Sequence, residues 1–207
     1  MLVVVAVIAV GAVVVMFRTS RRSVVAQPPL RPALGSPAQV WVERGERVNA
    51  ELAARLDGEP GWAAVTADAE SVLFDLRECA GSVAAYDQSL SGIDVTRLNA
   101  ERDRLAAEFA RAPENTDLRE ASSAVAARLA VAERERAARD AVLRRMQAAV
   151  AGLERCRDEA GELLSQSSVT IRPDTSPTGE MLDRLAGLRA GLAEVREISG
   201  SAGEGTP

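Results

Sequence analysis

A regular stripe of apolar side chains in residues 62–93 constrains the fold more than any other feature. Its members recur at alternating spacings of three and four residues: Trp62, Val65, Ala69, Val72, Leu76, Cys79, Val83, Tyr86, Leu90 and Ile93. This is the a/d pattern of a heptad repeat, which lines one side of an α-helix that packs against other helices. Charged residues between them, such as Asp68 and Asp75, are expected to face solvent. The pattern predicts an all-α protein.

The same spacing continues beyond this stripe. Ser91-Gly92 is expected to kink or break the helix, and the apolar pattern resumes at Val95 and runs to Ala112. We therefore predict a helix over residues 62–112, disturbed at Ser91-Gly92.

A short polar connection follows this helix. It consists of Pro113, Glu114, Asn115, Thr116 and Asp117. Proline disfavours the helical conformation of the residue before it, and Asp117 is expected to cap a second helix over residues 118–165. Helices of similar length joined by a tight connection are antiparallel neighbours. The sequence thus predicts a long helical hairpin, or antiparallel coiled coil, with its tip at residues 113–117.

Two shorter amphipathic helices, over residues 38–56 and 180–198, flank the hairpin in sequence. Each is expected to fold back on the adjoining arm, which makes a four-helix bundle at the base and leaves a two-stranded coiled coil toward the tip. The charged stretch 133–140 is interpreted as a register shift or a section exposed on all sides. Residues 199–207 are expected to be a disordered tail.

The first 17 residues are apolar from Leu2 onward and predict an N-terminal transmembrane helix of about 24 Å. Arg18, Arg21 and Arg22 follow this run, and no charge precedes it. By the positive-inside rule, the N-terminus lies outside the cell membrane and the body is cytoplasmic. A cleaved signal peptide with an exported body remains an alternative, although signal peptides carry their positive charge before the apolar run. Residues 18–37 contain four prolines and are expected to form an extended linker.

The missing residue types exclude several functions. The chain has no His and no Lys, so it lacks an imidazole base, a Schiff-base lysine and a P-loop lysine. Its net charge of −5 disfavours nucleic-acid binding. The spacings of the remaining residues match no catalytic, cofactor or metal motif, and they indicate no small-molecule substrate. We therefore expect a protein that is not an enzyme and has no cofactor.

Both cysteines, Cys79 and Cys156, occupy predicted seam positions. A hairpin centred near Asn115 would place them across from each other, with an axial offset of about 7 Å. Two independent buried thiols and a disulfide bond both remain open at this point.

Two functions fit these features. The first is a membrane-anchored coiled-coil scaffold or adaptor that recruits a protein partner or self-associates through its helices. Heavy Ala and Arg usage is typical of GC-rich bacterial genes. In a bacterium, such a scaffold would suit envelope maintenance, division or stress signalling. The second is an exported helical bundle that binds an apolar ligand or lipid.

Overall fold

The computed structural model describes residues 31–59, 61–167 and 177–203. Within these ranges the chain forms five α-helices and no strand, which confirms the predicted all-α class. The helices are α1 (Pro37–Leu56), α2 (Ala63–Ser91), α3 (Val95–Arg111), α4 (Thr116–Ser167) and α5 (Pro177–Gly203).

The predicted transmembrane helix 1–17 and the linker as far as residue 30 lie outside the described residues. Among the helices that are described, none combines the length and the apolar character needed to cross a bilayer. The anchor therefore stays a prediction from the sequence.

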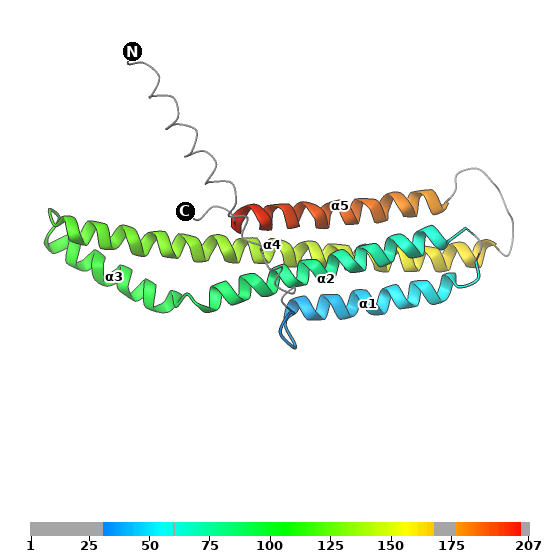
Figure 1. The fold of residues 1–207 in the computed structure, drawn as a ribbon, viewed down its shortest axis with the longest axis horizontal. Coiled ribbons are helices and arrows are strands. Elements are labelled where there is room, and N and C mark those ends of the chain that lie inside the picture. Colours follow the sequence, from blue (N-terminus) through cyan, green and yellow to red (C-terminus); the bar gives the residue numbers. More distant parts are fainter. Residues whose placement is uncertain (1–30, 60, 168–176, 204–207) are drawn as a thin grey trace, which may run out of the picture.

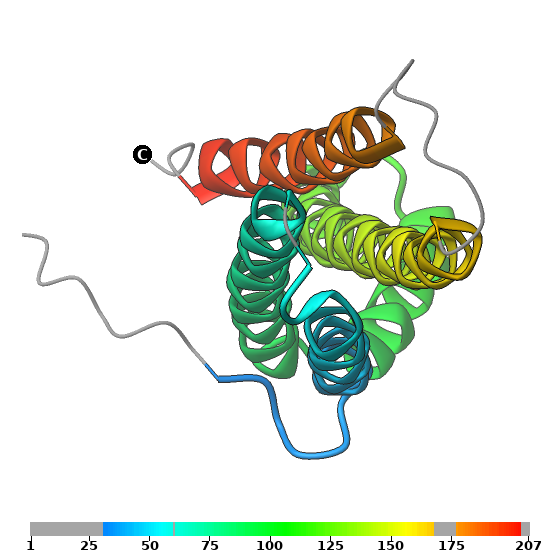
Figure 2. The same ribbon diagram turned by 90° about the vertical axis from the view of Figure 1, so that its right-hand side faces the viewer.

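Helices α2 and α3 run antiparallel to the long helix α4, and α1 and α5 pack on opposite sides of the α2–α4 pair (Figures 1 and 2). Helices α1 and α5 each contact both α2 and α4 but do not contact each other. Helix α3 packs against α4 alone among the described helices. The result is a rod with a four-helix bundle at one end and a two-helix arm at the other, as the apolar pattern predicted.

Two separate apolar cores follow from this division. The larger core fills the four-helix bundle, and its largest fully buried side chains include Leu52, Leu76, Met146, Leu153 and Leu185. The smaller core lies in the arm and consists of Leu98, Leu105 and Val125. A two-helix seam shields fewer side chains than a four-helix interior, because each helix is covered on one side only.

The disturbance expected at Ser91-Gly92 is a full break, which divides the predicted helix 62–112 into α2 and α3. Helix α2 ends at Ser91, and the backbone N–H of Gly92 donates to the carbonyl of Ser89 at 3.1 Å. Helix α3 then starts anew, because the Asp94 carboxylate accepts a hydrogen bond from the backbone N–H of Arg97 at 2.9 Å. That side-chain cap satisfies a donor that has no partner within the helix.

Other helix ends also differ from the prediction. Asn115, not Asp117, caps α4: its side-chain oxygen accepts from the backbone N–H groups of Asp117 at 3.0 Å and Leu118 at 3.2 Å. Helix α5 reaches Gly203, so the helix includes residues 199–203 of the predicted disordered tail. At the other end, Ser36 caps α1 and Pro37 occupies the first turn, where its missing N–H costs nothing.

The first turns of α1 and the last turns of α5 both lie near the middle of the rod (Figure 1). Two ion pairs show where these turns lie along α4: Arg44 of α1 contacts Glu154 of α4, and Glu194 of α5 contacts Arg145 of α4. The first part of α4 therefore has α3 as its neighbour. At 1.5 Å per residue, about 20 residues of this part extend roughly 30 Å from the bundle.

Candidate functional site

The two-helix arm is the first candidate site. Its core of Leu98, Leu105 and Val125 is bordered by half-buried apolar side chains, namely Ile93, Leu118 and Leu129. No other described helix covers these three residues in the arm, so a helix from another molecule has room to pack there.

The predicted tip residues all lie at the far end of this arm. All five are exposed. Pro113, Glu114 and Asn115 connect α3 to α4, and Thr116 and Asp117 are the first residues of α4. The Asn115 cap and a hydrogen bond from Arg119 to the carbonyl of Pro113 at 3.5 Å order the turn. The tip is thus a defined structure that presents polar groups.

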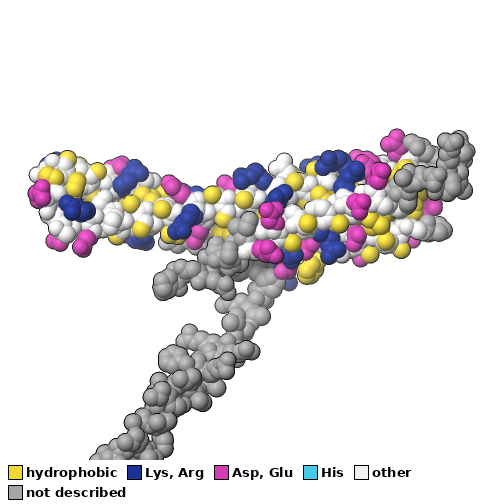
Figure 3. All heavy atoms as spheres, turned by 90° about the horizontal axis from the view of Figure 1, so that it is seen from above, with side chains coloured by type: hydrophobic (Ala, Val, Ile, Leu, Met, Phe, Trp, Pro, Cys, Tyr) yellow, Lys and Arg dark blue, Asp and Glu magenta, His cyan; other side chains and the backbone are white. Residues whose placement is uncertain are grey.

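The surface of the rod carries charges of both signs. On the face drawn in Figure 3, arginine and acidic side chains alternate along the arm and the bundle without a large area of one sign. Apolar side chains are exposed singly among them, for example Val131 on the arm and Phe74 on the bundle, which are 36% and 58% exposed. A face of this kind suits contacts of limited area with a partner that carries charges of both signs.

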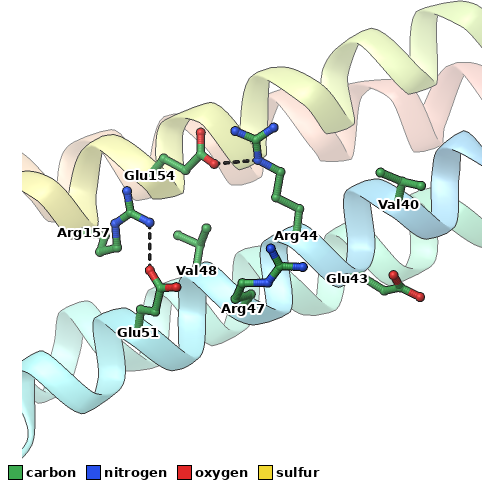
Figure 4. A pocket seen from close by; sticks show the side chains of 8 residues that line it. All are labelled: Val40, Glu43, Arg44, Arg47, Val48, Glu51, Glu154 and Arg157. Carbon is green, nitrogen blue, oxygen red and sulfur yellow. Dashed lines mark hydrogen bonds and ion pairs between the residues drawn. The ribbon is translucent and has the colours of Figure 1, made fainter.

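A groove between α1 and α4 is the second candidate site. It has a volume of about 380 Å³ and is lined by Val40, Glu43, Arg44, Arg47, Val48, Glu51, Glu154 and Arg157 (Figure 4). Two ion pairs span it: Arg44 to Glu154 at 2.6 Å and Arg157 to Glu51 at 2.8 Å. The three arginines and three glutamates of the lining balance in charge. The groove is therefore a set of interhelical ion pairs, with neither a nucleophile nor an apolar pocket.

No known protein family, characterised protein or solved structure matches this chain. The arrangement of its own residues is therefore the basis for assigning a role. Arg18, Arg21 and Arg22, the predicted membrane-flanking charges, lie outside the described residues.

The two cysteines do not face each other as the hairpin count suggested. Both are free thiols with no exposed surface. Cys79 Sγ lies 4.0 Å from the carbonyl oxygen of Leu192, whereas Cys156 lies beside the guanidinium of Arg184. These two contact points are eight residues apart on α5, which separates the thiols by about 12 Å along the rod. That distance is too long for a disulfide bond.

Burial governs the acidity of both thiols. It raises the pKa of Cys79 from 9.0 to about 11, against a smaller opposing effect of Arg196. Burial likewise raises the pKa of Cys156, with Arg184 acting in the opposite direction. Since the thiolate is the nucleophile and the metal ligand, both groups are unreactive in this state. Within the described ranges, no group of three or more His, Cys, Asp or Glu side chains is arranged to hold a metal ion.

The prediction that Asp75 faces solvent is wrong. This residue is 7% exposed, and its carboxylate meets two arginines of α5: Arg196 at 2.9 Å and Arg189 at 3.8 Å. Arg189 also reaches Asp68 at 3.5 Å. The sequence contains one hint of this second buried side, because Leu73 and Ala80 add apolar positions beside the main stripe.

Proposed function

We propose that the protein is a membrane-tethered scaffold whose α3–α4 arm binds a helical segment of a partner protein. The observation that supports this most directly is the set of half-buried apolar side chains, Ile93, Leu118 and Leu129, that borders the buried arm core and that no other described helix covers. Helix-in-groove recognition uses an apolar stripe of this kind.

The position of the arm also supports a tethering role. Residues 31–36 enter α1 near the middle of the rod, so an anchor at the N-terminus would hold the molecule there (Figure 1). The arm would then extend roughly 30 Å to one side of the point of attachment. The arm would thus present its binding face at a distance from the point where the chain is anchored.

The exported binding module for an apolar ligand or lipid has less support. The described groove of about 380 Å³ is lined mainly by charged side chains, and the cysteines are free thiols in the bundle core. An apolar ligand needs a pocket lined mostly by apolar side chains.

Site-specific photo-crosslinking of the full-length protein in cells tests the scaffold. A photoreactive amino acid replaces Leu118, a half-buried border residue of the arm, and, as the control, the exposed Phe74 on the bundle. We expect a discrete crosslinked protein from position 118 and none from position 74. Equal crosslinking from both positions, or none from the arm at any site, would contradict the proposal.

The orientation of the body needs its own measurement. A topology reporter fused after Pro207 is expected to show a cytoplasmic C-terminal region, as the arginines that follow the apolar run predict. A reporter active on the outer side would exclude a cytoplasmic scaffold and favour the exported alternative.

A further inference from the structure

Helix α5 covers both cysteines of the protein. Cys79 of α2 lies against the α5 backbone at Leu192, and Cys156 of α4 lies against Arg184 of the same helix. Both thiols are fully buried, on the side of the α2–α4 pair where α5 is seated. A reagent that reaches either thiol from this side must first displace α5.

Helix α5 packs closely on a surface formed by α2 and α4, which we call its seat, and this surface is polar at its edges. A β-carbon built on Gly152 of α4 would lie 2.6 Å from a methyl carbon of Leu188, so glycine at this position lets α5 approach closely. Ion pairs line the two edges: Arg189 and Arg196 contact Asp75 of α2, while Arg184 contacts Glu159 of α4. Many of these pairs are partly exposed, so they contribute modestly to holding the helix.

The rest of the molecule has contacts that do not involve α5. Helices α1, α2 and α4 all contact one another, and α3 contacts α4. Removing α5 would therefore leave a three-helix bundle with its arm still paired. Opening of α5 would expose four side chains that it buries in the bundle core, Met181, Leu185, Leu192 and Val195, and proteins do open locally in cooperative units of this size.

From these contacts we propose that α5 undocks as a unit while α1–α4 stay packed, and that this opening makes thiol modification and α5 docking mutually exclusive. In the open state a small-molecule disulfide, such as oxidised glutathione, reaches the thiols. The cysteine proton passes to water, the thiolate attacks one sulfur of the disulfide, and a mixed disulfide forms as the other half leaves as a thiolate. The adduct then occupies part of the seat of α5 and keeps the helix undocked.

The rate of thiol reaction in the native protein tests this proposal. The full chain is treated with the aromatic disulfide 5,5′-dithiobis(2-nitrobenzoate) as Cys79→Ala and Cys156→Ala variants, each of which retains one thiol. Protection is the ratio of the rate in the unfolded chain to that in the native chain. We expect the two thiols to have protection equal within about threefold, and a urea dependence clearly shallower than that of global unfolding.

Two glycine variants separate the opening of α5 from general destabilisation. Gly152→Val introduces a clash with Leu188 of α5, whereas Gly45→Val introduces one with Leu76 at the α1–α2 contact, where the built β-carbon lies 3.1 Å away. We expect Gly152→Val to speed the reaction of both thiols roughly 10- to 100-fold, and Gly45→Val to leave it within about threefold of the parent.

Other results would overturn the proposal. The first is that both thiols react only when the whole protein unfolds, so that their protection and its urea dependence equal those of global unfolding. This result can be obtained without the glycine variants. Another is an equal response to the two valine substitutions. A third is retained protection of α5 amides from hydrogen exchange after both thiols carry the adduct.

Discussion

Leu188 of α5 lies directly over Gly152 of α4, with its methyl carbons where a side chain on residue 152 would begin. By contrast, nothing lies within 4 Å of a β-carbon built on Gly187, the residue before Leu188. The two glycines lie in neighbouring helices. Substitution of Gly187 changes helix propensity alone, whereas substitution of Gly152 changes helix propensity and packing together.

Gly187→Ala should stabilise the protein by about 0.5–1 kcal/mol, because alanine favours the helix and meets no neighbour. Gly152→Ala should gain less or lose stability, since Leu188 must rotate away from its place. The free energy of unfolding from urea titrations measures both. An equal gain at the two positions would show that α5 does not pack closely on Gly152.

Loss of the Asp75 carboxylate should weaken the α2–α5 contact. Asp75→Asn removes the charge that Arg196 and Arg189 share, and we expect a loss of about 1–2 kcal/mol, reduced by the partial exposure of both arginines. Asp103→Asn is the control, because its pair with Arg102 is exposed on both sides and should change stability by less than about 0.5 kcal/mol. Chemical denaturation of the two variants compares them.

Alkaline pH should destabilise the protein through Cys79. Its pKa is about 11 in the folded protein against 9.0 ordinarily, so the unfolded chain loses this proton first. Stability is therefore fully present below pH 9 and declines between pH 9 and 11, by about 2–3 kcal/mol from this group. Cys79→Ala should flatten the decline in unfolding titrations between pH 8 and 11. An unchanged slope would mean that Cys79 is not buried as a neutral thiol.

The arm and the bundle should respond differently to truncation of a core leucine. Leu105→Ala acts on the three-residue arm core, so we expect faster amide hydrogen exchange in α3 and the facing part of α4 with little change in the bundle. Leu153→Ala, in the fully buried bundle core, should lower global stability by about 2–5 kcal/mol. Exchange that rises evenly along the chain in both variants would indicate one cooperative unit.

The apolar stripe of α2 was predictable in detail. Val65, Ala69, Val72, Leu76 and Cys79 are all buried as their spacing indicated. The turn between α3 and α4 was predicted to within two residues: α3 ends at Arg111 and α4 begins at Thr116, so Thr116 and Asp117 of the predicted tip lie in the first turn of α4.

Contacts between distant segments were not predictable in the same way. Asp75 was assigned to solvent because a single stripe describes a two-helix seam, whereas α2 touches three helices of the bundle. The two cysteines were placed opposite each other because counting from the tip assumes one continuous helix, and the interruption at Gly92 changes that count. Asp117 was predicted to cap α4, whereas Asn115 does so in the structure, because asparagine and aspartate have similar capping propensities and propensity alone does not rank the two.

Helix α1 begins and helix α5 ends near the middle of the rod, so the length of the arm does not depend on where residues 31–36 join the bundle. Seven residues added to α3, with seven more at the facing position of α4, would keep the heptad pattern and lengthen the arm by about 10 Å. Neither the bundle core nor the entry point of residues 31–36 would change. The span of such a molecule is therefore adjustable in heptad steps, independently of what holds it in place.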